Sequence, residues 1–336
     1  MPDLTRRSFL PIAPACLWAL ACFCGDAQAL MAGASPDDPR RRVDANRPDS
    51  PWSGVGAVCA GDAVFSGVLI GTRFALTAAH AVAHAQSSIR FTLNIGGPQP
   101  ASIAVARVVV HPEYRGGAGP SAPHDLALLE LAEAAPAAAR IHPLYAGEVS
   151  PGTPLLFVGY GASGQGDSGP SVAADPTVKR IGTNEVDRLG ARDPSGQALV
   201  FAYDFDGPGR PNAMGGTGMR ADRESIAAQG DSGAPAFIRR AGRWELAGIL
   251  TFVTAKDGEG MPAGTFGTVG GGLLLAPSRD WILQTVAGQS LARPYPRGPA
   301  QPPAISPSRQ DREFRSSAPS GPQARIDTTN RPGNRP

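Results

Sequence analysis

Between residues 52 and 287 the chain repeats one pattern, a short apolar run closed by Gly, Pro, Asn or Asp. With 42 Gly and 34 Pro among 336 residues, little uninterrupted chain remains for long helices, so these runs favour β-strands. Strands this short and this closely spaced are typical of sandwiches or barrels rather than βαβ units. The predicted strands are Gly54–Cys59, Val64–Ile70, Phe74–Ala78, Ile89–Ile95, Ile103–Val110, Leu126–Leu131, Leu155–Tyr160, Ala198–Tyr203, Ala234–Ile238, Trp244–Val253 and Phe266–Leu275. The sequence therefore predicts an all-β fold.

One helix is predicted at the end of this region, over residues 277–286. We expect Ser278 to cap it. Trp281, Ile282 and Thr285 fall on one side of a helix with 3.6 residues per turn, so we expect them to form its buried face.

The first 29 residues have the pattern of a signal peptide. Arg6 and Arg7 precede a short apolar run, and Ala27-x-Ala29 is a small-residue cleavage site. The run is too short to span a bilayer comfortably. The paired arginines resemble the twin-arginine export motif, but Pro11 replaces its usual Lys, so an ordinary secretory route stays open. We expect cleavage after Ala29, a secreted or periplasmic protein and no stable membrane insertion.

Two other segments differ in composition from the strand-rich region. Residues 30–50 are polar and Pro-rich with three successive arginines, which indicates a leader or propeptide, flexible in structure. Residues 288–336 lack periodicity and hold eight Arg against three acids, a pattern that predicts a disordered Pro/Arg-rich tail. Docking of this tail on an acidic surface is the alternative to a solvated linker. The whole chain carries only +2, so its charge gives no reason to expect nucleic-acid binding.

The cysteines predict a domain without disulfides. Cleavage after Ala29 would remove Cys16, Cys22 and Cys24 and leave Cys59 without an intrachain partner. Cys59 lies in an apolar stretch, so we interpret it as a buried core thiol.

Three segments carry residues for nucleophilic catalysis. His80 follows a strand that ends in small residues, Asp125 precedes a strongly apolar strand, and Ser232 lies in a turn bounded by Gly230 and Gly233. A serine hydroxyl needs an adjacent base, and the base needs an orienting carboxylate. The glycines allow the backbone N–H groups of Gly230 and Ser232 to point at a developing oxyanion.

These segments, in the same order, resemble the His, Asp and Ser boxes of the chymotrypsin-like (trypsin-like) serine peptidases. The residues that carry the resemblance are Leu76-Thr77-Ala78-Ala79-His80, Asp125-Leu126-Ala127-Leu128-Leu129 and Gly230-Asp231-Ser232-Gly233-Ala234-Pro235, with further similarity at Pro51-Trp52, Val158–Gly161, Gly248–Thr251 and Asp280–Ile282. The resemblance covers residues 51–287. It implies two packed antiparallel β-barrels with a C-terminal helix, and the catalytic triad His80, Asp125 and Ser232 in the cleft between the barrels.

The function implied by the resemblance is that of a bacterial secreted serine endopeptidase working through an acyl-enzyme intermediate. Its partners would be protein or peptide substrates, and we expect a monomer without cofactor or catalytic metal. An inactive trypsin-like domain that serves as a binding module is the alternative. Asp204 and Asp206 could bind a calcium ion through their carboxylate oxygens, but two acids this close in sequence more commonly belong to a solvated turn.

A second serine turn repeats the sequence of the first. Gly166-Asp167-Ser168-Gly169-Pro170 matches the serine box, but only 43 residues separate Asp125 from Ser168 and no apolar strand follows. We therefore interpret Ser168 as part of a surface turn.

Substrate preference and activation are the least defined features. The residues expected to line the substrate pocket are Ile226, Thr251 and Val253. Ile226 stands where an acid marks trypsin-like pockets, and the branched Val253 would shorten the pocket, so we expect a small or medium apolar P1 residue. Glu224 lies close enough in sequence to complicate this expectation. By the family's activation route, cleavage after Arg42 would free Val43 to pair with Asp231.

Overall fold

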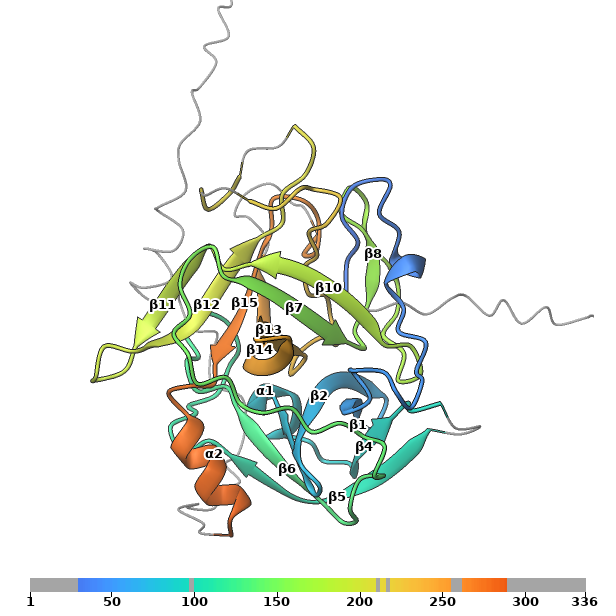
Figure 1. Cartoon of the computed structure of the whole chain (residues 1–336), viewed down its shortest axis with the longest axis vertical. Coiled ribbons are helices and arrows are strands. Elements are labelled where there is room, and N and C mark those ends of the chain that lie inside the picture. The colour runs from blue at the N-terminus through green and yellow to red at the C-terminus, as the bar shows by residue number, and fades with distance from the viewer. Residues whose placement is uncertain (1–29, 97–99, 210–211, 216–217, 255–261, 289–336) are drawn as a thin grey trace, which may run out of the picture.

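The structure is a computed structural model that describes residues 30–96, 100–209, 212–215, 218–254 and 262–288 (Figure 1). The predicted signal peptide and nearly all of the predicted tail lie outside these residues. The elements in chain order are η1 (Pro39–Arg42), β1 (Val55–Ala60), β2 (Ala63–Gly71), β3 (Phe74–Thr77), α1 (Ala79–Val82), β4 (Ile89–Leu93), β5 (Ala101–Val110), β6 (Ala127–Leu131), β7 (Pro154–Gly159), β8 (Ser163–Gln165), β9 (Gly169–Val172), β10 (Arg180–Glu185), β11 (Arg188–Arg192), β12 (Ala198–Asp204), β13 (Pro235–Arg240), β14 (Arg243–Thr254), β15 (Val269–Leu274) and α2 (Arg279–Val286). No helix among the described residues is long and apolar enough to cross a membrane.

Strands β1 to β6 close into a barrel in the order β1-β2-β3-β6-β5-β4. All of its strand pairs are antiparallel, and it forms the lower half of the molecule in Figure 1. Phe91, Leu128 and Leu129 are among the fully buried residues of its core. Closure leaves no unpaired strand edge, so this barrel is a rigid support for residues at its rim.

The second half is a seven-stranded antiparallel sheet in the order β10-β7-β13-β14-β15-β12-β11, beside the small hairpin β8-β9. Strand β15 carries three successive glycines, and at the first two of them aromatic rings occupy the space that a side chain would need. A Cβ on Gly270 would lie 2.6 Å from Tyr203 Cζ, and one on Gly271 would lie 2.3 Å from Phe252 Cζ. A closed barrel packed on a second sheet agrees with the double-barrel fold that the sequence predicts.

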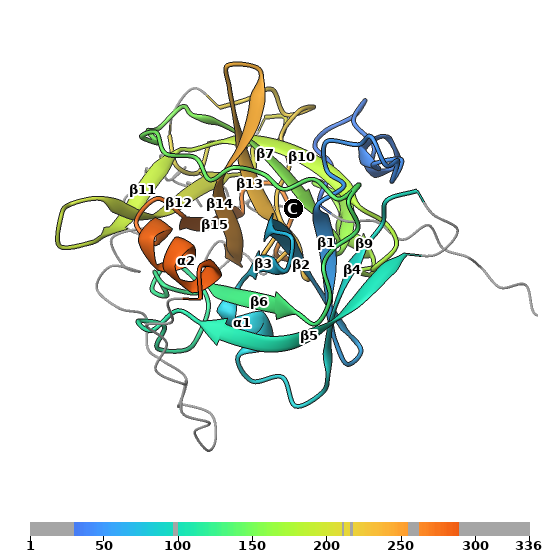
Figure 2. The same ribbon diagram turned by 60° about the horizontal axis from the view of Figure 1, so that its bottom comes forward.

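Helix α2 crosses from the second sheet and packs on the first barrel (Figure 2). Its buried residues are Trp281, Ile282 and Thr285, as the periodicity predicts. The expectation for Ser278 is wrong in one respect: it occupies the N-cap position, but its side chain makes no capping hydrogen bond.

The segment of residues 30–50 is packed against the second sheet, and its interpretation as a flexible leader needs correction. Leu30 and Met31 are completely buried in the core of this half. Further along, the buried Asp44 carboxylate pairs with Lys179 Nζ at 2.9 Å. The polar and Pro-rich composition predicted flexibility because tertiary partners such as Lys179 are not visible in the local sequence.

Candidate active site

His80 and Asp125 meet because β3 and β6 pair in antiparallel register. Thr77, the last residue of β3, lies opposite Ala127, the first of β6, so the residues beyond both ends share one rim of the barrel. The His80 backbone N–H donates to Asp125 Oδ1 at 2.8 Å, and His80 Nδ1 lies 2.6 Å from Asp125 Oδ2. Asp125 is completely buried, and these two contacts hold the imidazole in one orientation.

Ser232 completes the arrangement from the second half of the molecule. Its Oγ lies 2.7 Å from His80 Nε2, on the edge of the ring opposite Asp125. Since the His80 side chain keeps 22% of its exposure, a substrate can approach the Oγ–Nε2 pair from solvent. The structure thus brings together the three residues that the sequence predicts as a triad, at the hydrogen-bond distances that proton transfer requires.

The turn around Ser232 depends on glycines with positive φ. Gly230 has φ +96° and Gly233 has φ +84°. A Cβ on Gly233 would lie 2.3 Å from both Ser66 O and Thr77 Oγ1, so a side chain cannot fit there. Within the part of the chain that the structure describes, no group accepts a hydrogen bond from the backbone N–H of Gly230 or Ser232. Both donors therefore remain available for an oxyanion.

Asp231, between the glycine and the serine, is completely buried and anchors the turn. Its carboxylate accepts the N–H groups of Gly161 and Ala228, each at 2.9 Å. The N–H of Leu30 also donates to it, which brings the start of the described chain to the serine turn. Burial raises the pKa of Asp231 to about 7, against the opposing effect of these three donors.

Ser66 on β2 is a positioning residue that sequence reasoning missed. Its N–H donates to Ser232 O at 3.0 Å, its hydroxyl donates to Gly230 O at 3.1 Å, and the same hydroxyl accepts the Tyr160 N–H at 3.0 Å. The residue is fully buried and ties the first barrel to the serine turn on both sides of Asp231. The local signal was weak, because a serine within a short strand has many ordinary explanations.

Ser168 lies elsewhere, in the exposed turn between β8 and β9. Its hydroxyl donates to its neighbour Asp167, while His80 contacts Ser232. Cys59 also differs from expectation in part, since it is half-buried on β1 rather than fully enclosed.

The residues predicted to line a substrate pocket are largely enclosed. Ile226 is completely buried in the core of the second half, Thr251 is 2% exposed, and Val253 is half-buried against the same core. Glu224 is 1% exposed, and its Oε2 accepts the Asp206 N–H at 2.6 Å. Burial raises the pKa of Glu224 to about 8, so its carboxyl is mostly neutral at pH 7.

The structure also places the residues considered for calcium binding and for activation. Asp204 Oδ2 accepts the Met214 N–H at 2.7 Å, and in the described ranges neither Asp204 nor Asp206 joins three convergent metal-ligating side chains. In the uncleaved chain, Val43 is 40% exposed and pairs with Arg180 of β10, whereas the backbone N–H of Leu30 contacts Asp231.

The architecture and this constellation agree with a comparison against protein families. The family model described as Trypsin matches residues 41–268, a span that includes His80, Asp125 and Ser232 and covers more than half of the 336 residues. The chain therefore belongs to the trypsin family of serine peptidases.

Proposed function

We propose that this chain is an active serine endopeptidase and that His80, Asp125 and Ser232 perform its chemistry. The observation that carries the proposal is the continuous hydrogen-bonded path from the buried Asp125 carboxylate through the imidazole to Ser232 Oγ. An inactive binding domain would have no need to preserve both contacts together with two unengaged N–H donors. Trypsin-family membership supports proteins and peptides as the substrate class.

In the proposed reaction, Ser232 Oγ attacks the scissile carbonyl carbon while His80 Nε2 takes the hydroxyl proton. The carbonyl electron pair moves onto oxygen, where the N–H groups of Gly230 and Ser232 stabilise it. Asp125 keeps the Nδ1 proton in place and stabilises the imidazolium. His80 then passes the proton to the leaving amine, and a water molecule, activated by the same base, hydrolyses the acyl-enzyme.

A fluorophosphonate probe tests this proposal directly, since it reacts only with an activated serine. We expect covalent label on Ser232, lost in Ser232→Ala and retained in the matched control Ser168→Ala. A folded wild-type protein that takes no label would favour the binding module instead. Label mapped to a different residue would contradict the assignment of the nucleophile.

We further propose that the enzyme prefers an apolar P1 residue. Position 226, where trypsin-like pockets carry an acid, holds Ile, and the nearby Glu224 is mostly neutral at pH 7. A basic P1 side chain requires a carboxylate at the base of its pocket. Cleavage of a peptide library should therefore favour small or medium apolar P1 residues. A profile dominated by Arg or Lys would overturn this.

Secretion and activation belong to the same proposal. Signal cleavage after Ala29 would make Leu30 the first residue, and Leu30 already donates its N–H to the Asp231 carboxylate. Its φ of +56° is unfavourable for a non-glycine residue, and this strain disappears when the preceding peptide bond is cut. The new ammonium group would pair with Asp231, so Leu30 replaces Val43 as the predicted activating terminus.

The measurement is N-terminal sequencing of the exported protein, followed by assay of protein that starts at Leu30 or one residue earlier. We expect sequence beginning at Leu30 and a loss of activity with the extra residue. Full activity in protein that begins at Val43, or equal activity with the extension, would contradict this route.

A further inference from the structure

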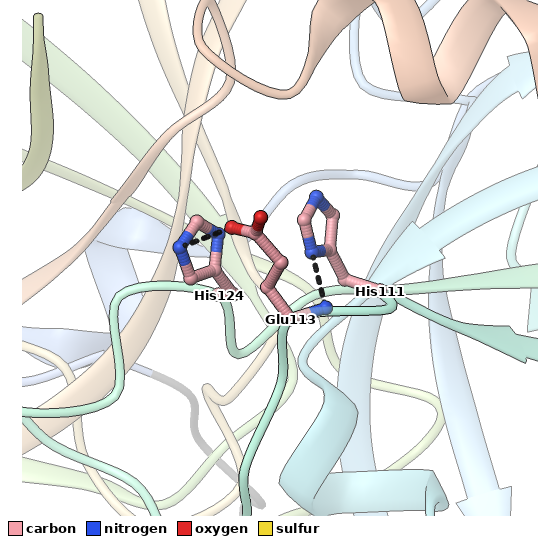
Figure 3. A group of neighbouring side chains, drawn as sticks. All are labelled: His111, Glu113 and His124. Atoms are coloured by element: carbon pink, nitrogen blue, oxygen red, sulfur yellow. Dashed lines mark hydrogen bonds and ion pairs between the residues drawn. The ribbon is translucent and has the colours of Figure 1, made fainter. Parts of the chain in front are cut away.

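Three side chains near the triad converge without contributing to it. His111 follows strand β5, Glu113 lies two residues further on, and His124 immediately precedes Asp125. One ligand atom from each lies within 4.8 Å of the other two. Figure 3 shows the Glu113 carboxylate between the two imidazole rings in this view.

Hydrogen bonds among the three residues do not satisfy all their polar atoms. Glu113 Oε2 lies 2.9 Å from His124 Nε2, and His111 Nδ1 accepts the Glu113 backbone N–H at 3.3 Å. The two rings stack with centroids 4.9 Å apart and an interplanar angle of 14°. His124 Nδ1 is buried and has no hydrogen-bond partner among the described residues. The cluster is thus compact, nitrogen-rich and incompletely paired.

Both imidazoles are neutral at neutral pH and therefore keep a lone pair. Burial lowers the pKa of His111 to about 4, helped by the neighbouring His124 and Arg115. Burial also lowers the pKa of His124, although Glu113 opposes the change. The Trp281 ring of α2 packs against the His111 ring, with ring centroids 4.7 Å apart, while 61% of the Glu113 side chain is exposed. Trp281 therefore covers one side of the site, and the Glu113 carboxylate leaves the other side open to solvent.

We propose that His111, Glu113 and His124 bind a divalent transition-metal ion, with Zn²⁺ as the best match. Two neutral imidazoles and one carboxylate form a ligand set that suits Zn²⁺, whereas Ca²⁺ and Mg²⁺ prefer oxygen alone. The three ligand atoms already lie within 4.8 Å of one another, and the exposed Glu113 side chain can supply the small movement that a shared ion requires. Water would complete the coordination.

The position of this site couples it to the triad. His124 is joined to Asp125 by a peptide bond, and the next residue, Leu126, donates its N–H to His124 O at 2.7 Å and accepts the His111 N–H at 2.9 Å. A metal ion that pulls His111 and His124 together therefore strains the turn that carries Asp125. We expect bound Zn²⁺ to slow peptide hydrolysis, an effect that rests on the proposed function, whereas binding itself does not.

Binding is tested on full-length Ser232→Ala protein, which removes the proposed nucleophile so that self-cleavage does not interfere. Zn²⁺ titration by calorimetry should show one site per chain, and Co²⁺ should give visible absorption bands of a nitrogen-containing site. Glu113→Gln and His124→Gln should each weaken Zn²⁺ binding about tenfold or more. Glu133→Gln, an exposed carboxylate change in the same barrel, is the matched control and should leave affinity unchanged.

Zn²⁺ affinity that is equal in Glu113→Gln, His124→Gln and the parent would overturn the proposal, as would the absence of binding at one ion per chain. For the active protein, inhibition by Zn²⁺ that persists unchanged in Glu113→Gln would assign the effect to another site, such as His80. Loss of inhibition in Glu113→Gln with retained uninhibited activity would support the coupling.

Discussion

The chain contains the tetrapeptide Gly-Asp-Ser-Gly twice, and the two copies have different structures. At residues 166–169 it forms the turn between β8 and β9, in which Asp167 and Ser168 are exposed and the Ser168 hydroxyl donates to Asp167. At residues 230–233 the aspartate is completely buried, and the serine faces His80. Identical local sequence therefore does not determine the burial of the aspartate or the partner of the serine.

The difference comes from what surrounds each aspartate. Asp231 accepts the N–H group of Ala228 from within its own turn, and those of Gly161 and Leu30 from segments 70 or more residues away in sequence. Asp167 has no comparable enclosure, since its side chain lies on the surface. The buried carboxylate fixes the backbone on which Ser232 and the two unengaged N–H groups depend. Four matched experiments test this difference between the two turns.

The largest difference is expected between the two serines. Ser232→Ala should lower kcat on the order of 10⁶-fold because it removes the nucleophile, whereas Ser168→Ala should change kcat less than twofold. Steady-state hydrolysis of a peptide substrate measures both. A large loss in Ser168→Ala, or a small one in Ser232→Ala, would reverse the assignment.

The final glycines of the two turns should differ in their effect on stability. Gly233→Ala places a Cβ 2.3 Å from Ser66 O at φ +84°, so backbone strain and overpacking should together cost about 3 kcal/mol. Gly169→Ala has φ +82° but meets only the end of the Thr265 side chain at 3.1 Å, so about 1 kcal/mol is expected. Urea unfolding in a Ser232→Ala background compares them, and equal losses would show that the packing difference is unimportant.

Among the aspartates, Asp231→Asn should lower kcat/KM about 10²-fold, the size of the loss when one oxyanion donor is misplaced. An amide nitrogen at this position would face the N–H donors of Gly161 or Ala228 instead of accepting from them. Asp167→Asn should leave kcat/KM unchanged within twofold. Should both variants retain full activity, the buried carboxylate would have no role in shaping the turn.

The last difference concerns the pH dependence of stability, measured in protein that still has a residue before Leu30. Native Asp231 keeps its proton up to about pH 7, while its unfolded form loses it near 3.8, so the native state binds more protons between these values. Stability should therefore fall as pH rises from about 4 to 7, by at most about 1.4 kcal/mol per pH unit.

Asp231→Asn should flatten this slope relative to the parent, and Asp167→Asn should not. Glu224, Asp187 and Asp206 also have raised pKa values and contribute slopes of the same sign, so the difference between variants is the informative quantity. An unchanged slope in Asp231→Asn would mean that this carboxyl ionises normally in the folded chain.

Much of the fold could be predicted because its signals are local. Each predicted apolar run corresponds to a strand within a few residues, and the buried face of α2 follows from its period. The strands that were missed are β8, β9, β10 and β11. Strands β8 and β9 are short and pair only with each other. Strands β10 and β11 are polar, with residues such as Arg180, Asn184 and Arg188, and they acquire strand structure from their partners β7 and β12.

The sequence alone predicted the all-β class, the resemblance to the trypsin family and the three residues His80, Asp125 and Ser232. It could do so because strand periodicity and the residues beside each reactive group are encoded within a few positions of one another. The folded chain was needed to show that Leu30 contacts Asp231 and that Ser66 bonds to the serine turn on both sides of Asp231. It was also needed to show that His111, Glu113 and His124 converge. These contacts join segments separated by tens to hundreds of residues, or they depend on the conformation of a loop. Local composition encodes neither the long-range contacts nor the loop conformation.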